Sequence, residues 1–151
     1  MTDSAQLEVG FGEFAVGFAP MDELHREFHD LLIDLQRPGD HGEKLLALHD
    51  HLLRHCGQED HWMRTSEYPA CACHTREHEM LLEVVAEVRR RFDAGDSDIA
   101  TRLAQELPQW FELHASAMDA SLAAHLQALQ WPASVAAATG KDARRLAATV
   151  D

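Results

Sequence analysis

The sequence predicts an all-α fold, an antiparallel up-down-up-down four-helix bundle. Three observations lead to this prediction. Apolar residues recur at spacings of three and four in four long segments, short connections containing proline or glycine separate these segments, and no segment alternates apolar and polar residues as a strand does. Amphipathic helices joined by short connections bury their apolar faces best against one another, in antiparallel order. A chain of 151 residues, 46% hydrophobic and 26% charged, suits one such domain.

The N-terminal half contains an arm and two helices. Residues 1–19 show no helical period, so we expect an extended arm that packs on the bundle through three aromatic side chains, Phe11, Phe14 and Phe18. Pro20 suits the first turn of the next segment, a helix ended by RPGD at 37–40. The apolar stripe of this helix comprises His25, Phe28, Leu32 and Leu35. A second helix begins between Asp40 and Glu43 and ends near Ser66. Its inner stripe comprises Leu45, Leu48, Leu52, His55, Glu59 and Trp62 or Met63.

The C-terminal half contains two more helices and a tail. The third helix runs from about Cys71 to Ala94, and its inner stripe comprises His74, His78, Leu81, Val85, Val88 and Phe92. After a turn with an N-cap at Asp96 or Ser97, the fourth helix runs from about Ile99 to Leu129. Pro108 is expected to kink or split it. Its stripe comprises Leu103, Leu107, Trp110 and His114, then Ala117 or Met118, Ser121 or Leu122, and His125 or Leu126.

The expected organisation is one domain over residues 1–151. Its core lies at about 20–130, the arm at 1–19 and a tail at 131–151, and the alanine-rich segment 133–150 predicts a short fifth helix.

Charge and hydropathy argue against several classes of partner. The formal net charge of −13 disfavours nucleic acid, because phosphate binding needs a basic face. No apolar run approaches the ~18 residues of a membrane span. The first ten residues lack the basic start and apolar core of a secretory signal, so we expect a cytoplasmic protein. Three cysteines, an odd number with two in a C-x-C arrangement, predict reduced thiols: Cys56, Cys71 and Cys73.

Histidines on the inner stripes are the strongest functional signal. Of eleven in the chain, five occupy stripe positions: His25, His55, His74, His78 and His114. A buried polar group without a partner costs about 2–7 kcal/mol. A small bundle core cannot supply partners for five imidazoles and for Glu59 on the same stripe, so a metal site is predicted.

Spacing supports most of this site. His55 and Glu59 are four residues apart and share a helix face, and His74 and His78 do the same. Asp119 follows His114 by five residues, about 140° around an α-helix, and is the weakest member on spacing alone.

Two of the remaining histidines leave alternatives open, and a third lies too far away. His29 and His51 lie one turn from His25 and His55, and each could be a second partner of the site, a substitute ligand or a rim residue. His125 lies on the same predicted face as His114 but three turns away, too far for one metal centre.

The segment HTREH at 74–78 also matches the H-x-x-E-H signature of a class of zinc proteases. That interpretation needs a substrate-binding domain, for which the chain has no room, and it leaves the other stripe histidines unexplained. Glu77 points about 100° away from His78, so we expect it on the solvated flank of the helix.

The ordered set of residues resembles the hemerythrins, in particular the single-domain bacterial hemerythrins. The resemblance covers about residues 11–129 and rests on VGFAPMDELH ending at His25, HCGQED beginning at His55, YPACACHTREH ending at His78, and WFELHASAMDASL around His114 and Asp119.

The resemblance implies a non-haem di-iron centre with an oxo or hydroxo bridge inside the bundle. The implied ligands are His74, His78 and His114 for one iron, His25 and His55 for the other, and Glu59 and Asp119 for both. The second iron then has an open position, at which dioxygen binds reversibly. Phe28 and Trp110 are expected to line an apolar ligand pocket, and Ala115 stands where the family commonly has a bulky aliphatic residue.

The implied function is therefore dioxygen binding, for storage, delivery or supply, without catalytic residues and without a nucleic-acid or membrane partner. The alternatives are an enzyme acting on peroxide, nitric oxide or iron, and a sensor. An enzyme would need a proton donor near the open iron, and His29 is the candidate. A ferritin-like carboxylate site is disfavoured, because the chain contains no E-x-x-H motif.

Overall fold

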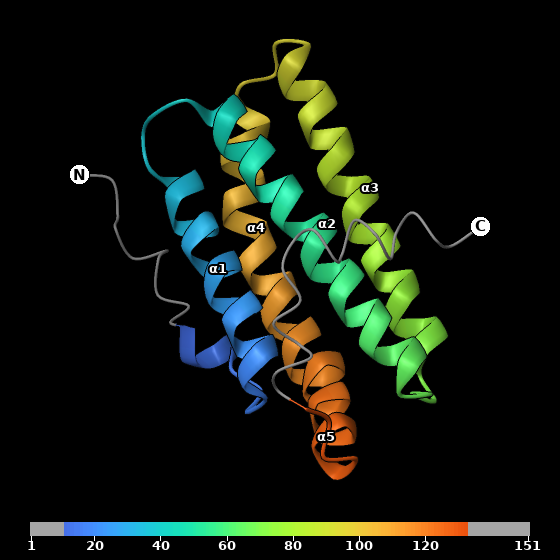
Figure 1. The fold of residues 1–151 in the computed structure, drawn as a ribbon. Helices are drawn as coiled ribbons and strands as arrows, with labels where there is room; N and C mark the ends of the chain where they lie inside the picture. The colour runs from blue at the N-terminus through green and yellow to red at the C-terminus, as the bar shows by residue number, and fades with distance from the viewer. Residues whose placement is uncertain (1–10, 133–151) are drawn as a thin grey trace.

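The computed structural model describes residues 11–132, which form a bundle of long antiparallel helices and contain no strand (Figure 1). The helices are α1, Ala19–Gln36; α2, His41–Thr65; α3, Cys71–Asp93; and α4, Asp98–His114, which continues through a π-helical turn, Ala115–Asp119, into α5, Ala120–Ala128. Both α1 and α3 pack against α2 and α4. The predicted fold class is confirmed, and α4, the π-helical turn and α5 together form the predicted fourth helix.

The connection between α1 and α2 follows from its turn residues. Pro38 cannot continue a helix, and Gly39 adopts a φ of +142°, which a side chain would oppose. The carboxylate of Asp40 then accepts a hydrogen bond from the backbone N–H of Glu43 at 3.2 Å and caps α2. Lys44 Nζ donates to three carbonyls at the end of α1, those of Asp34, Arg37 and Pro38, at 2.9–3.0 Å. These contacts fix the two helices side by side.

The other connections are equally short. Residues 66–70, with Pro69, separate α2 from α3, and Gly95 at a φ of +108° lies between α3 and α4. Ser97 is the residue before α4, as predicted, but its side chain makes no capping hydrogen bond.

Pro108 lies inside α4 without splitting it, contrary to one of the two expected outcomes. Proline has no N–H, so the carbonyl of Ala104, four residues earlier, loses its helical donor. Gln36 Nε2, at the end of α1, donates to that carbonyl at 2.9 Å. A side chain from the neighbouring helix therefore satisfies the group that the proline leaves without a partner.

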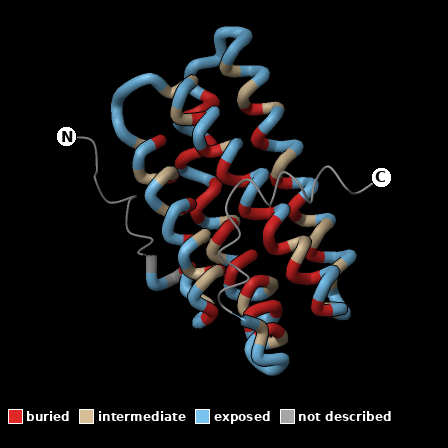
Figure 2. Tube along the Cα trace, in the orientation of Figure 1, coloured by how far each residue is buried: buried red, intermediate tan, exposed pale blue. Residues whose placement is uncertain are grey.

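Two apolar clusters fill the bundle, and buried residues recur along each of the long helices (Figure 2). The larger contains Phe28, Leu32 and Leu35 of α1 and extends toward the α1–α2 connection. The smaller contains Met21, Trp62 and Leu122. Along α1 the order Met21, His25, Phe28 places the first stripe histidine between the two clusters. None of the helices within residues 11–132 is both long and apolar enough to cross a bilayer.

The part of the N-terminal arm that the structure describes, from residue 11 onward, packs on the bundle and is not wholly extended. Residues Phe11–Phe14 form a short 3-10 helix, and Phe14 and Phe18 are buried. The side chain of Phe11 and the predicted helix at 133–150 lie outside the part of the chain that the structure describes.

Candidate metal centre

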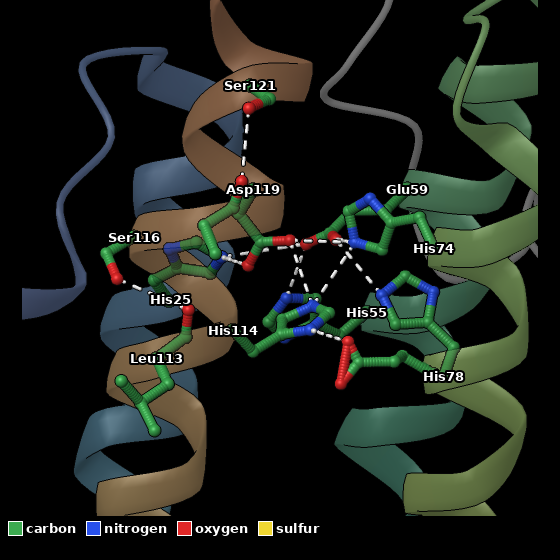
Figure 3. Close-up of polar contacts among 12 residues, drawn as sticks. His25, His55, Glu59, His74, His78, Leu113, His114, Ser116, Asp119 and Ser121 are labelled. Atoms are coloured by element: carbon green, nitrogen blue, oxygen red, sulfur yellow. Dashed lines mark hydrogen bonds and ion pairs between the residues drawn. The ribbon is translucent and has the colours of Figure 1, made fainter.

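Seven buried residues from all the long helices meet in the middle of the bundle (Figure 3). His25 comes from α1, the next four from α2 and α3, and the last two from α4 and its π-helical turn. Each is at most 4% exposed: His25, His55, Glu59, His74, His78, His114 and Asp119. The structure thus brings together every residue that the sequence singled out as a metal ligand.

These residues fall into two groups that share both carboxylates. One group contains three imidazoles, those of His74, His78 and His114, and the other contains two, those of His25 and His55. Glu59 and Asp119 belong to both groups, and within each group the ligand atoms lie within 4.8 Å of one another. The division is the same as the one that the resemblance implies.

Each carboxylate turns one oxygen toward each group. Glu59 Oε2 lies 2.7 Å from His55 Nε2, whereas its Oε1 lies 3.4 Å from His74 Nε2 and 3.3 Å from His78 Nε2. Asp119 Oδ2 lies 3.0 Å from His25 Nε2, whereas its Oδ1 lies 2.9 Å from His74 Nε2. Two such carboxylates can bridge a pair of metal ions.

The position of Asp119 depends on the π-helical turn. In an α-helix, a residue five after His114 points about 140° away. Residues 115–119 instead form i→i+5 bonds, with Ala120 N–H donating to the Ala115 carbonyl. This wider turn places residues five apart on the same face. Asp119 Oδ1 accordingly lies 3.1 Å from His114 Nε2, so the doubt raised by α-helical spacing does not apply.

The two buried carboxylates of the cluster favour positive charge on the imidazoles around them. Burial would lower the pKa of His25, but contacts with Asp119 and Glu59 outweigh it and raise the pKa to about 10. For the same reasons the pKa of His74 is raised to about 9. In His78, contacts with Asp60 and Glu59 outweigh burial and raise the pKa to about 10. Without metal, protons on these imidazoles therefore neutralise the two buried carboxylates.

The carboxylates themselves stay ionised. Burial would raise the pKa of Glu59, but the charge and contacts of the surrounding histidines hold it well below its usual range. Burial and the neighbouring Glu59 would likewise raise the pKa of Asp119, but contacts with His114, His25 and His74 keep it below its usual range.

Several atoms that face the cluster remain without hydrogen bonds. His25 Nε2, Glu59 Oε1 and both carboxylate oxygens of Asp119 are buried and find no hydrogen-bond partner of good geometry among residues 11–132. Buried polar groups are normally satisfied. Imidazole nitrogens and carboxylate oxygens are ligands that suit iron, so the residues present fit a metal centre.

Comparison with known proteins agrees with this geometry. The family profile described as "Hemerythrin HHE cation binding domain" matches residues 16–126. The chain belongs to the hemerythrin family. It is 36% identical over 106 residues to a bacteriohemerythrin of Ralstonia nicotianae, covering 69% of this chain and 77% of the relative. It is 32% identical over 120 residues to a bacteriohemerythrin of Stenotrophomonas maltophilia, covering 75% and 77%. No solved structure matches the chain.

In this hemerythrin domain, groups outside the seven hold the imidazole rings in place. His25 Nδ1 donates to the Phe14 carbonyl at 2.7 Å, which links the N-terminal arm to the centre. His78 Nδ1 donates to Asp60 Oδ1 at 2.8 Å, and the Thr75 hydroxyl donates to the same oxygen at 3.2 Å. Such partners fix the orientation and tautomer of a ligating histidine. The sequence did not predict the contact of His25 with the Phe14 carbonyl or the contact of His78 with Asp60.

Glu77 is a further partner of the hemerythrin centre. It was expected on the solvated flank of α3, which is only partly right. Its side chain is 31% exposed, and its Oε2 lies 3.7 Å from His114 Nδ1. Glu77 thus faces a stripe histidine on α4 and not the histidines of its own HTREH segment.

The two histidines left open by the sequence have different positions. His51 is buried, and its Nε2 lies 3.1 Å from His55 Nδ1. Burial, followed by the neighbouring His55, lowers the pKa of His51 to about 3, so it is neutral. His29 belongs to neither metal-capable group and packs edge-on against the Phe14 ring, with centroids 5.7 Å apart.

Three phenylalanine rings form the wall beside His25 and His55. Phe111 is central, with its ring centroid 5.1 Å from that of His25, 5.9 Å from His55 and 4.3 Å from Phe28. Phe14 packs edge-on against Phe111 at 4.8 Å. Phe111 was not predicted, although Leu107, Phe111 and His114 continue the spacing of four and three.

Trp110, the other predicted pocket residue, lies on the side of the three-histidine group. Its ring stacks on that of His114 at 5.0 Å and 13°. It also lines an open, mostly apolar cavity of about 220 Å³ between α3 and α4.

The three cysteines and His125 belong to neither group of potential ligands. Cys56 is buried, Cys71 half-buried and Cys73 exposed, and all three are free. Burial, with the nearby carboxylates, raises the pKa of the Cys56 thiol well above its usual value. His125, expected on the face of His114, instead forms a 3.0 Å hydrogen bond with the Ser66 carbonyl.

Proposed function

We propose that this hemerythrin-family chain holds two iron ions and binds dioxygen reversibly. One iron would be held by His74, His78 and His114, and the other by His25 and His55. Glu59 and Asp119 would bridge the two ions. The observation that carries the proposal is that each buried carboxylate presents one oxygen to each histidine group. A single-metal site would not need carboxylates divided in this way.

The unequal numbers of imidazoles support a binding role. The group of His25 and His55 offers one nitrogen fewer than the other, which leaves a coordination position for a ligand. When two ferrous ions are bound, they supply the two electrons that dioxygen binding takes. The chain's own contribution is to hold the ligands, keep the position open and exclude water.

The surroundings of that position favour binding over catalysis. Phe14, Phe28 and Phe111 surround the two-histidine group, and none of these rings can donate a proton. The ring of His29, the candidate donor, packs edge-on against the Phe14 ring, with centroids 5.7 Å apart. An enzyme acting on peroxide or nitric oxide would need a proton near its substrate. We therefore favour a carrier or store of dioxygen, and its expected cytoplasmic location stays a prediction.

Metal analysis and absorption spectra test the proposal. Purified protein should contain two iron ions per chain, and air should give the reduced form a charge-transfer band that disappears on deoxygenation. Glu59→Gln should lose iron and the band, whereas Glu79→Gln, at an exposed position of α3, should keep both. One zinc ion and no iron would sink the di-iron assignment. Rapid irreversible bleaching with turnover of peroxide would replace the carrier by an enzyme.

A further inference from the structure

His51 is a buried histidine that the proposed metal centre does not use directly. It lies one turn before His55 on α2, is 1% exposed and belongs to neither group of potential ligands. Its ring stacks against Phe28, with centroids 6.1 Å apart and an interplanar angle of 17°. His51 Nε2 lies 3.1 Å from His55 Nδ1, within hydrogen-bond distance. A buried imidazole held in this way has a defined orientation.

Ligation of His55 would fix the direction of this hydrogen bond. His55 Nε2 faces the cluster, 2.7 Å from Glu59 Oε2. A neutral imidazole that binds a metal through Nε2 carries its hydrogen on Nδ1. His55 Nδ1 therefore donates, and His51 Nε2 accepts. The single hydrogen of the neutral His51 ring is then on Nδ1, on the opposite side of the ring.

Two acceptors lie near that hydrogen, the backbone carbonyl of Leu24 and the carboxylate of Glu27, and neither makes a hydrogen bond of good geometry with His51 Nδ1. Glu27 Oε2, on α1, lies 3.3 Å from His51 Nδ1, and its side chain is 46% exposed. The resulting series, Glu27, His51 and His55, runs from the solvent edge of the bundle to the centre. A negative charge at its outer end favours the tautomer in which His51 accepts from His55.

We propose that His51 is a positioning residue for the metal centre, which orients His55 and, through Glu27, increases the basicity of that ligand. This inference rests on the proposed metal site. His78 Nδ1 contacts the carboxylate of Asp60 directly, whereas His55 Nδ1 contacts the imidazole of His51. The two halves of the centre therefore differ in the partners of their histidines as well as in histidine count.

Cobalt(II) titration of the metal-free protein, followed by its absorption spectrum, tests the proposal without requiring oxygen binding. His51→Leu removes the acceptor, and we expect one of two cobalt sites to weaken by about 10- to 100-fold, the usual cost of losing such a partner. His51→Gln keeps an acceptor and should restore most of the affinity and the spectrum. Glu27→Gln should weaken the same site to a smaller extent.

Glu23→Gln is the matched control, because Glu23 is another exposed carboxylate on α1 and forms an ion pair with Arg26 at 3.2 Å. It should leave both cobalt sites unchanged. In the iron-loaded protein, His51→Leu should also raise the reduction potential of the centre, because a less basic ligand stabilises ferric iron less. Loss of packing alone would not be reversed by Gln.

Wild-type cobalt affinity in folded His51→Leu would overturn the proposal. If neither histidine variant folds, Glu27→Gln decides: unchanged cobalt affinity and spectrum would overturn it as well. The outcome is distinguishable from failure of the di-iron assignment. A wild-type protein that binds two cobalt ions with the expected variant effects, yet contains no iron, would retain the positioning role and lose the dioxygen function.

Discussion

At the scale of a single residue, the Phe111 ring packs against the two-histidine side of the centre. It is 2% exposed and contacts the rings of His25, His55, Phe14 and Phe28. Removing part of this ring would open space beside the position proposed for dioxygen. Water entering that space would meet the buried carboxylates.

Phe111→Leu should therefore speed the autoxidation of the oxygenated form while leaving two iron ions bound. The loss of stability should be smaller than the about 3–5 kcal/mol typical of Phe→Ala in a core. Decay of the charge-transfer band in air measures autoxidation. Phe92→Leu is the control, because Phe92 is half-buried near the end of α3, away from the ligands. Equal decay rates in wild type and Phe111→Leu would refute the role of the ring.

The stripe histidines were predictable because the helical period of the apolar residues, which indicates the buried face, can be read within a single helix. Their partners were not, because those contacts depend on how neighbouring helices meet. Asp60 follows Glu59 and points about 100° away from it, so nothing in the spacing assigns it to His78 on α3. The Phe14 carbonyl, being backbone, leaves no mark in the sequence at all.

At the scale of elements, α1 and α4 are joined by the bond between Gln36 and the carbonyl of Ala104. That carbonyl lacks a donor within its own helix, because Pro108 has no N–H. Leaving a buried acceptor unsatisfied costs about 1–3 kcal/mol. The contribution of Gln36 should therefore depend on the presence of the proline.

A double-mutant cycle tests this dependence. Gln36→Leu should destabilise the protein by about 1–3 kcal/mol with Pro108 in place, because the Ala104 carbonyl loses its donor. With Pro108→Ala, the helix supplies its own N–H, and Gln36→Leu should cost much less. Urea unfolding of the four proteins gives the coupling free energy. Additive effects would show that the bond contributes nothing specific to the pair.

Helix boundaries followed from local chemistry, because capping and turn residues act over a few positions. The predicted start between Asp40 and Glu43 and the predicted end near Ser66 agree with α2, His41–Thr65. The π-helical turn was not predictable in this way, since residues 115–119 contain no residue that requires it. The 3-10 helix at Phe11–Phe14 was missed for a similar reason.

At the scale of the whole molecule, metal ions and protons compete for the same imidazole nitrogens. Three histidines have raised pKa values: His25 at about 10, His74 at about 9 and His78 at about 10. Metal binding requires neutral imidazoles. Loading the metal-free protein at pH 7 should therefore release about three protons per chain. A pH indicator in weak buffer measures the release, and metal affinity should rise with pH. Proton-free uptake would contradict the assignment of these nitrogens as ligands.

The stability of the metal-free protein should depend on pH with the opposite sign. The three histidines have folded pKa values above their ordinary 6.5, so their stabilisation is complete below pH 6.5 and is lost as pH rises to 9 or 10. The lowered pKa values of Glu59 and Asp119 give stability that is lost only as pH falls below their ordinary 4.5 and 3.8. The urea midpoint should therefore fall from pH 7.5 to pH 9, a range in which His51, whose pKa is lowered to about 3, is neutral in the folded protein. A midpoint that rises toward pH 9 would rule out this charge arrangement.

The π-helical turn also determines the direction in which the His125 side chain on α5 points. In an uninterrupted α-helix, His125 would follow His114 by three turns and point along the same line into the bundle. The wider turn holds one residue more than an α-helical turn, which shifts the inward-facing positions after it by one residue. Leu122 and Leu126 therefore take the interior positions. His125 rotates out to the Ser66 carbonyl and ties α5 to the connection between α2 and α3. The π-helical turn thus brings the Asp119 carboxylate to the centre and leaves the His125 imidazole to form a structural hydrogen bond.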